Sequence, residues 1–352
     1  MNTPVITALA TYVPATVTLR QWCRIDRARC AVPLAGWADH VYPDWFAAYG
    51  LDLRRLMQPL AGRAATLASL AATGIGTVPL ERDLDLSGLA AHVARAVCAA
   101  PDRHTPRIDI AMFCHSSIDE HVSTTAAGRL RAVIAQPCFP FSLAQQQGAS
   151  ILTALEITAD LFTAEPALRG VLIVGAEKWC HPFARRIGHW TLQGDAAGAM
   201  LVERAALTTH GLRLLGTTVQ PLADARAPFG LPDSLACANA SFAGALAGAI
   251  DSLLQQHHVH ANEIAAVIAH RVNQPLVDTV LRHLGIASDR CVRDERAYLG
   301  AAETIVRLSE TLRAVELPHG LLLAWAVGLG GYVGCALLEA RGTPCLRTVN
   351  GT

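Results

Sequence analysis

Apolar runs of strand length alternate with segments of helical periodicity in the chain from residue 84 onward. The pattern predicts a helix over 85–97, a strand over 108–114, a helix over 124–135, a strand and turn over 139–149, a helix over 150–162 and a strand over 170–176. Asp85 and Ser87 are candidate capping residues at the start of the first helix. Strands that alternate with helices are typical of parallel packing, so we expect an α/β fold.

The first eighty residues are less regular. Residues 6–19 alternate enough to predict a first strand, and Pro14 within them favours a break or an edge position. Residues 45–56 and 61–72 carry helical spacing without a recognisable chemical motif.

Residues 321–338 are eighteen residues without a charged side chain, long enough for a candidate membrane span. Four glycines interrupt this stretch, however, including a Gly-Leu-Gly-Gly sequence that starts at Gly328. An apolar run broken by such a turn fits two buried neighbouring strands better than a helix that faces lipid. We therefore expect no membrane association.

Parts of the second half of the chain echo the first. Residues 334–339 resemble 198–203, each set after a glycine-rich turn, and 321–327 has a counterpart in 171–175. Likewise, 264–270 resembles 108–115, each an apolar strand that ends in histidine. The first and last of these pairs are offset by 136 and 155 residues, so the repeat is imperfect. The pattern indicates an internal duplication.

Bulk composition narrows the class of function. Lys and Arg together number 29, as do Asp and Glu, so no charge excess points to a nucleic-acid partner. The ten cysteines form no Cys-x-x-Cys pair, and their spacing with histidine predicts no zinc site. The first residues lack a basic region of the kind that precedes a signal sequence. These features predict a cytoplasmic protein with reduced thiols, no metal and no cofactor.

A strand that runs through a small-residue turn into a helix is the clearest candidate site. The free N–H groups and the positive end of a helix favour a developing negative charge. Residues 139–155 resemble the nucleophile turn of the β-ketoacyl-acyl-carrier-protein synthase III family, in which Phe-Asp-x-x-x-x-Cys-x-Gly precedes a helix that contains Ala-Leu. Residues 193–203 resemble the Phe-Gly-Asp-Gly-Ala-Gly-Ala turn of the same enzymes, where Asp195 fits a structural role.

This resemblance implies the thiolase fold, with two pseudo-symmetric halves, 1–205 and 206–352, in an α-β-α-β-α arrangement. The cysteine of the family turn is missing. Counting forward from Phe141 puts Gln147 in its place, and counting back from Ala154 and Leu155 puts Gly148 there. We prefer Gly148, because a helix resists an insertion better than a turn does.

Two further segments carry the resemblance. His270 begins a sequence similar to the family's His-Gln-Ala-Asn segment, whose histidine binds the thioester carbonyl, and Asn273 matches the asparagine. Tyr298-Leu-Gly-Ala-Ala-Glu303 stands where the family has Gly-Asn-Thr-Ser. It also resembles the Gly-x-x-Asp pattern of acyltransferase relatives, so Glu303 is a candidate to orient His270. The alternative is that Glu303 is a solvated glutamate in the first turn of a helix that runs to Ala314.

Other residues are expected to line the substrate pocket. Cys114, Ser116 and Ser117 follow a predicted strand, and Gly330 lies in the glycine-rich turn near the end of the chain. These three side chains and Gly330 are therefore candidate substrate-binding residues, together with Asn273.

The function implied is the handling of acyl thioesters, on CoA or an acyl carrier protein, in a biosynthetic pathway and without a cysteine nucleophile. The leading hypothesis is acyl transfer to an acceptor, with His270 as general base and turn amides near Gly148 stabilising the oxyanion. One alternative is a non-catalytic subunit that partners a cysteine-bearing synthase. A second alternative is a malonyl-thioester decarboxylase that uses Gln147. The resemblance also implies a homodimer, or a heterodimer with a related synthase.

Overall fold

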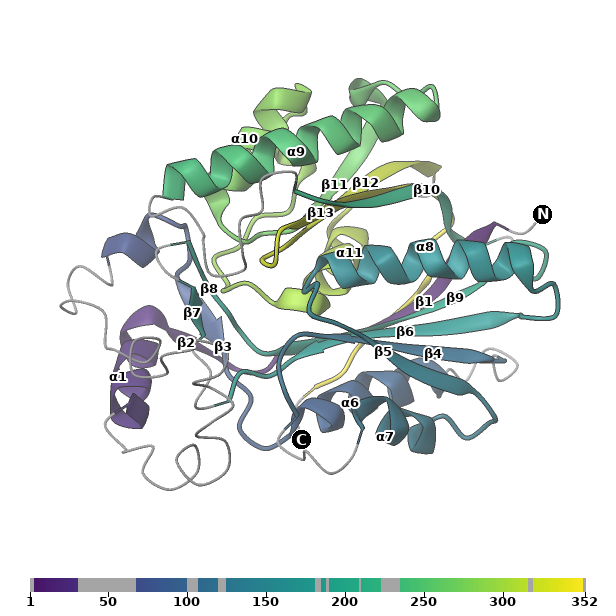
Figure 1. The fold of residues 1–352 in the computed structure, drawn as a ribbon, viewed down its shortest axis with the longest axis horizontal. Helices are drawn as coiled ribbons and strands as arrows, with labels where there is room; N and C mark the ends of the chain where they lie inside the picture. The colour runs from purple at the N-terminus through teal and green to yellow at the C-terminus, as the bar shows by residue number, and fades with distance from the viewer. Residues whose placement is uncertain are drawn as a thin grey trace, which may run out of the picture.

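The computed structural model describes residues 3–30, 68–99, 107–119, 125–180, 185–187, 190–208, 210–222, 235–315 and 319–350. The helical segment predicted over 45–56 and the first part of that predicted over 61–72 lie outside these residues. Figure 1 shows the chain as a layered α/β fold.

The described residues include the helices α1 (Leu19–Cys30), α6 (Leu86–Cys98), α7 (Ala126–Val133), α8 (Ala149–Ala164), α9 (Leu235–Gln256), α10 (Gln274–Leu284) and α11 (Glu303–Ala314), with three short 3₁₀ turns, η1 (Ala261–Glu263), η2 (Ser288–Arg290) and η3 (Gly300–Ala302). Residues 68–71, within the segment predicted over 61–72, are also helical. Asp85 caps α6 by accepting from the N–H of Gly88, whereas Ser87 lies inside that helix. The predicted helix start is therefore confirmed, with Asp85 as its cap.

The strands are β1 (Pro4–Tyr12), β2 (Thr16–Thr18), β3 (Thr77–Pro79), β4 (Ile110–His115), β5 (Phe139–Ala144), β6 (Gly170–Glu177), β7 (Arg186–Ile187), β8 (Thr191–Leu192), β9 (Ala196–Arg204), β10 (Gly211–Pro221), β11 (Ile264–Ala269), β12 (His319–Gly328), β13 (Tyr332–Arg341) and β14 (Cys345–Thr348). The strand predicted over 6–19 breaks at Pro14 into β1 and β2, which is one of the two alternatives expected there, because proline has no N–H to give to a ladder.

One ten-stranded sheet runs in the order β11-β12-β13-β10-β1-β9-β6-β4-β5, and β14 pairs with β1. Its two halves have the same plan. In the first, β4 is parallel to β6, and antiparallel pairs follow from β6 to β9 and from β9 to β1. In the second, β11 is parallel to β12, and antiparallel pairs follow from β12 to β13 and from β13 to β10. The duplication predicted from the sequence is confirmed.

The predicted equivalences hold strand by strand in this plan. β4 corresponds to β11, β6 to β12 and β9 to β13, and the halves join where β1 pairs with β10. The predicted boundary near residue 205 falls between β9 and β10 and stays a prediction. β12 and β13 form the two neighbouring strands predicted for 321–338. In the part of the chain that the structure describes, no helix is long and apolar enough to cross a membrane.

Three apolar clusters lie between five layers, which Figure 1 shows stacked from α9 and α10 to α6 and α7. α6 and α7 cover one face of the first half-sheet, with Val93 and Phe113 in that core. α8 and α11 lie between the half-sheets, around Leu152 and Ile305. α9 and α10 cover the second half-sheet, around Trp325. The predicted thiolase layering is confirmed.

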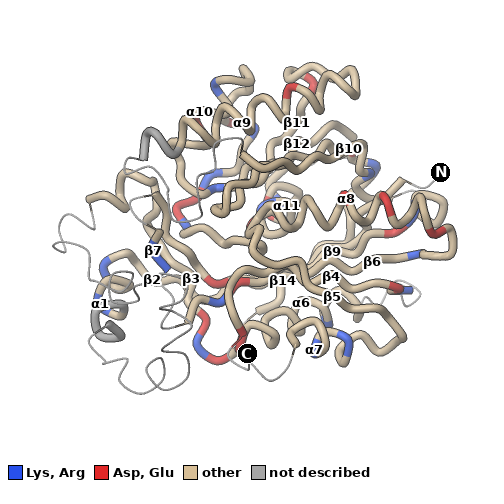
Figure 2. The backbone as a smooth tube through the Cα atoms, viewed as in Figure 1, with Lys and Arg blue, Asp and Glu red and all other residues tan. Residues whose placement is uncertain are grey.

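Charged residues of both signs are interspersed along the described backbone, and no long stretch of one sign stands out (Figure 2). The strands of the main sheet are drawn almost entirely in the colour of uncharged residues, as their burial on both faces requires.

Candidate functional site

The turn between β5 and α8 has a strained backbone. Gln145 and Gln147 adopt positive φ angles of 67° and 46°, which non-glycine residues seldom do. The N–H of Gln147 donates to Ser116 Oγ at the end of β4, at 3.0 Å. Gly148 follows in helical conformation as the cap of α8. Gln145 and Gln147 are therefore the strained residues of the turn, and Gly148 precedes the helix as its cap.

Gly148 lies directly against the ring of His270. A Cβ atom added to Gly148 would stand 1.9 Å from both Cε1 and Nε2 of that ring. Such a separation is far inside van der Waals contact, so the position accepts glycine alone while His270 keeps its place. The two residues that the sequence placed at the site are brought together.

Backbone groups hold both ring nitrogens of His270, which is 1 % exposed and comes directly after β11. The N–H of Val327 donates to Nδ1 at 3.3 Å. Because an N–H can only donate, Nδ1 is unprotonated, and Nε2 donates its proton to the carbonyl of Gly300 at 3.2 Å. Burial lowers the pKa of His270 to about 4, so the ring is neutral near pH 7.

Tyr298 fills the space beside His270 and Gly148. Its ring meets the imidazole edge to face, with centroids 4.8 Å apart, and it is completely buried. Its hydroxyl donates to the carbonyl of Val327 at 3.0 Å and accepts from the N–H of Gly148 at 3.4 Å. Sequence reasoning quoted Tyr298 without giving it a role, although a tyrosine in place of the family's small polar residues was a visible signal.

The side-chain amide of Gln147 is also engaged. Its Oε1 accepts from the N–H of Leu329 at 3.0 Å, and its Nε2 donates to Gln193 Oε1 at 3.4 Å. Gly330 lies beside the same turn, since a Cβ atom on it would stand 3.4 Å from the carbonyl oxygen of Gln145. Gly330, which the sequence predicted to line the pocket, therefore lies next to the turn between β5 and α8.

Glu303 is fully buried, so the interpretation of a solvated first-turn glutamate is wrong. Its carboxylate accepts from Arg307 Nε at 2.8 Å, from the N–H of Leu299 at 2.9 Å and from the N–H of Arg271 at 3.4 Å. Its charge opposes the fall in the pKa of His270, but these hydrogen bonds go to groups other than the imidazole. Its orienting role stays a prediction without a direct bond behind it.

Of the three residues predicted to line the pocket at the end of β4, only Ser116 has a hydrogen bond to the turn described here. Ser116 Oγ accepts the N–H of Gln147. Ser117 Oγ accepts the N–H of Lys178 at 2.9 Å instead. Cys114 is fully buried, and burial raises the pKa of its thiol to about 12, which leaves little thiolate for attack.

Asn273 lies in a separate buried network. Its side chain caps α10 by accepting from the N–H of Leu276 at 3.0 Å, and it exchanges two hydrogen bonds of 3.0 Å with Asn239. These bonds give Asn273 a structural place at the helix start. Its predicted substrate contact stays a prediction.

Glu177, at the end of β6, is a site residue that sequence reasoning missed. It is fully buried, and its carboxylate accepts from the N–H groups of Ser116 at 3.0 Å, Ser117 at 2.7 Å and Ala301 at 3.3 Å. Burial raises the pKa of Glu177 to about 7 against the opposing effect of these bonds. A charged residue directly after an apolar strand was the signal that could have found it.

Stability should depend on pH through Glu177. Because folding raises its pKa from 4.5 to about 7, the folded chain binds this proton more tightly. The stabilisation is full below pH 4.5 and is lost as pH rises through 7, by about 3 kcal/mol. We expect Glu177→Gln to abolish this loss, so that the free energy of unfolding of the variant relative to wild type rises by about 3 kcal/mol over that range.

Urea unfolding of both proteins across the same pH values checks this. The glutamine NH₂ would face backbone N–H groups, which adds a constant cost, so only the slope is diagnostic. His270 has the opposite dependence: its pKa is lowered on folding, so its stabilisation is present above pH 6.5 and lost as pH falls through 4. Since both proteins keep His270, its contribution cancels in the difference. Parallel pH profiles would contradict the prediction.

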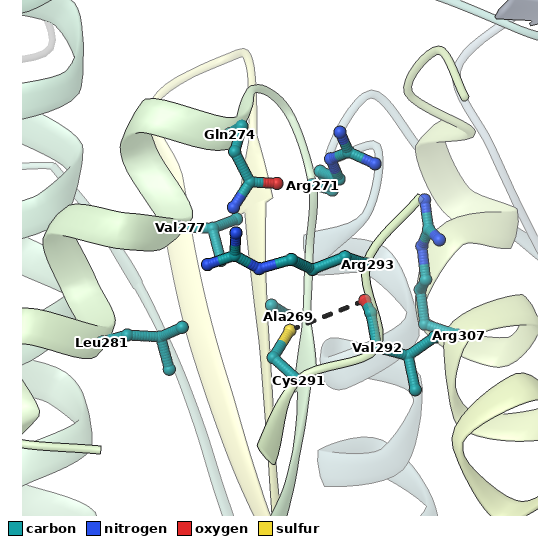
Figure 3. A pocket seen from close by; sticks show the side chains of 9 residues that line it. All are labelled: Ala269, Arg271, Gln274, Val277, Leu281, Cys291, Val292, Arg293 and Arg307. Atoms are coloured by element: carbon teal, nitrogen blue, oxygen red, sulfur yellow. Dashed lines mark hydrogen bonds between the residues drawn. The ribbon is translucent and has the colours of Figure 1, made fainter. Parts of the chain in front are cut away.

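A small cavity lies between α10, α11 and residues 291–293 (Figure 3). Arg271, Arg293 and Arg307 contribute to its walls, and the Arg293 side chain lies across it in Figure 3. Arg271 and Arg307 are both paired with Asp294. The cavity is lined by none of the predicted site residues, but Arg271 and Arg307 in its walls both donate to Glu303.

Comparisons with known proteins find related sequences and structures. The family model described as "3-Oxoacyl-[acyl-carrier-protein (ACP)] synthase III C terminal" matches residues 254–340, which include His270 and Glu303. A β-ketoacyl-acyl-carrier-protein synthase III of Acidiphilium cryptum is 25% identical over 280 residues, covering 71% of this chain and 83% of that protein. The same enzyme of Neisseria meningitidis is 24% identical over 281 residues, covering 72% and 83%. These similarities support a synthase III-like family with the thiolase fold for this chain.

Solved structures place the synthase III-like protein in the same fold. The synthase III FabH of Pseudomonas aeruginosa superimposes with a TM-score of 0.71 at 18% identity, covering 97% of this chain and 99% of that one. The acyltransferase ChlB3 gives a TM-score of 0.72 at 16% identity, with the same coverage. OleA of Xanthomonas campestris, with bound lauric acid and lauroyl-CoA, gives 0.72 at 15% identity, covering 96% and 99%.

Proposed function

We propose that this synthase III-like protein is a non-catalytic subunit that assembles with a cysteine-bearing synthase in a fatty-acid-related or other biosynthetic pathway. The observation that carries the proposal is that the polar groups around His270 bond to one another. Both ring nitrogens of His270 are held by backbone. The N–H groups of Gly148 and Leu329 are held by side-chain oxygens of Tyr298 and Gln147.

A catalytic role would need those groups free. A general base needs an accessible nitrogen lone pair, and an oxyanion needs N–H donors that point at it. Here each donor already has an acceptor from the chain itself, and the ring has a Val327 N–H on its only lone pair. This arrangement weighs against acyl transfer with His270 as base. It weighs equally against decarboxylation through Gln147, because the amide of that side chain is bonded at both ends.

The edge strand β5 is the surface that we propose for the partner. The N–H of Phe139 donates to the carbonyl of Asp109, and that of Gln145 donates to the carbonyl of His115. Since the backbone N–H and C=O groups alternate in direction along a strand, those of Ser142 and Ala144 point to the free edge of the sheet. Pro140 falls in the same outward set, where a missing N–H costs no ladder bond within the chain.

An apolar contact accompanies this open edge. Phe139 is 67% exposed and lies 6.1 Å from the ring of Phe141. An exposed strand edge beside aromatic side chains favours pairing with a strand of another chain. A second thiolase-fold chain, a related synthase that carries the cysteine, is the partner we propose. An acyl thioester, on CoA or an acyl carrier protein, would then react at the partner's cysteine.

The first test is chemical. We expect intact-protein mass spectrometry to show no adduct after incubation with acetyl-, malonyl- or longer acyl-CoA, and thioester assays on the same samples to show no consumption. Co-expression with a cysteine-bearing synthase III of the same organism should yield a heteromer with activity. Consumption by the isolated protein that disappears in His270→Ala would overturn the proposal in favour of direct transfer or decarboxylation.

The second test concerns the edge strand. Phe139→Asp places a charge in the apolar contact and should weaken association at least tenfold, as measured by analytical ultracentrifugation. Leu207→Asp is the matched control, because Leu207 is 52% exposed and lies outside β5. Equal effects of the two substitutions, or association that persists in Phe139→Asp, would show that the partner binds elsewhere.

A further inference from the structure

One peptide group joins Glu177 to His270. The carbonyl of Gly300 accepts from His270 Nε2 at 3.2 Å, and the N–H of Ala301 donates to Glu177 Oε1 at 3.3 Å. These two groups belong to the same peptide unit, since the carbonyl of one residue is bonded to the nitrogen of the next. Carboxylate, peptide and imidazole therefore form one continuous hydrogen-bonded chain.

The donor-to-acceptor direction of this hydrogen-bonded chain is fixed at both ends. The Val327 N–H on Nδ1 places the ring proton on Nε2, where it is donated to Gly300. At the other end, the carboxylate accepts the peptide N–H. Each bond polarises the next in the same direction, so a negative charge on Glu177 strengthens the carbonyl of Gly300 as an acceptor.

The peptide has little freedom to turn away. Gly300 has a φ angle of +55°, and a Cβ atom on it would stand 2.5 Å from Cγ of Glu177. Glu177 itself is tied to the end of β4 by the N–H groups of Ser116 and Ser117. The side chain of Glu177 thus packs on the peptide that it bonds, and it fixes the plane of that peptide.

We infer that Glu177, acting through the Gly300–Ala301 peptide, is the residue that positions His270. Glu303, the carboxylate that the sequence suggested for this role, is occupied by Arg307 and two backbone N–H groups. Glu177 is a positioning residue, because it touches the ring only through the peptide. The inference goes beyond the proposed function, since this coupling exists whether or not the site turns over.

Nitrogen NMR of the histidine ring tests the coupling directly. In protein labelled with ring ¹⁵N-histidine, long-range ¹H–¹⁵N correlation distinguishes a protonated ring nitrogen from an unprotonated one. His270→Gln identifies the His270 signals among those of the 14 histidines. We expect wild type at about pH 8 to show a protonated Nε2 and an unprotonated Nδ1. Glu177→Gln should shift the Nε2 signal, while the Val327 N–H keeps Nδ1 unprotonated.

Two further variants keep the test decisive. Glu303→Gln is the matched control, a buried glutamate exchanged in the same way, and it should leave the Nε2 signal of His270 unchanged. Glu177→Asp keeps the charge but withdraws it by one methylene, and it should give an intermediate shift. This variant also serves if Glu177→Gln fails to fold.

The inference is overturned if Glu303→Gln moves the Nε2 signal of His270 and Glu177→Gln does not, or if neither Glu177 variant moves the ring signals. These outcomes are separate from those of the proposed function, which is decided by adducts, thioester consumption and association.

Discussion

Gly148→Ala should destabilise the protein by about 3 kcal/mol or more, the upper range for overpacking in a buried site. The added methyl group would stand 1.9 Å from two atoms of the His270 ring. The ring cannot move aside without breaking its bonds to Gly300 and Val327, which leaves buried polar groups unpaired. Urea unfolding followed by tryptophan fluorescence measures the loss.

A second substitution separates the steric cause from other effects. In the Gly148→Ala background, His270→Ala makes room for the methyl group, so the double variant should lose less stability than the two single losses added together. Gly244→Ala is the control, because nothing lies within 4 Å of a Cβ atom at that position of α9. It should stabilise the helix by up to about 1 kcal/mol. A cost below 1 kcal/mol for Gly148→Ala would mean that the ring does not pack there.

Asp195→Asn should cost about 3–5 kcal/mol, the range for breaking a buried ion pair. Asp195 is fully buried and holds Arg185 through two hydrogen bonds of 2.6 and 2.7 Å. The same carboxylate accepts from the N–H groups of Glu81 and Trp179, both at 2.9 Å. Asparagine would leave the guanidinium charge buried without its counter-charge and turn a donor toward other donors.

Denaturant unfolding again gives the measurement. Arg107→Ala is the contrasting case: Arg107 pairs with Asp109 at 2.6 Å, but its side chain is 59% exposed, so the loss should stay below about 1 kcal/mol. Replacing both Arg185 and Asp195 by apolar residues should recover part of the loss, because no buried charge then remains. An equal cost for Asp195→Asn and Arg107→Ala would refute the structural role of Asp195.

The periodicity of the sequence predicted most of the regular structure. The sequence predicted the helix start at Asp85, the hairpin over 321–338 and the repeated strands. Each of these depends on apolar spacing, glycine and capping residues that lie close together in the chain. The early region was predicted less well. There the alternation over 6–19 predicted strand structure, and Pro14 left open whether the strand would break or lie at an edge.

The candidate site was predicted in part. His270 and Gly148 were named from motifs, and the structure brings them into contact. Tyr298 and Glu177 were not given roles, because nothing in their local sequence says what they touch. Glu177 bonds to the N–H of Ala301, 124 positions away, and Tyr298 bonds to that of Gly148, 150 positions away.

The sequence alone determined the order of elements, the duplicated plan, the placement of His270 directly after a strand, and the absence of cysteine at both positions proposed for it. These properties depend on residue type and on short spacing. Only the tertiary structure decided which group each buried polar atom bonds. A buried carboxylate takes whatever donors the fold brings within about 3 Å, and that choice is made by strands and turns far apart in the chain. For that reason Glu303 accepts a hydrogen bond from Arg307, and the hydrogen-bonded chain that reaches His270 starts at Glu177.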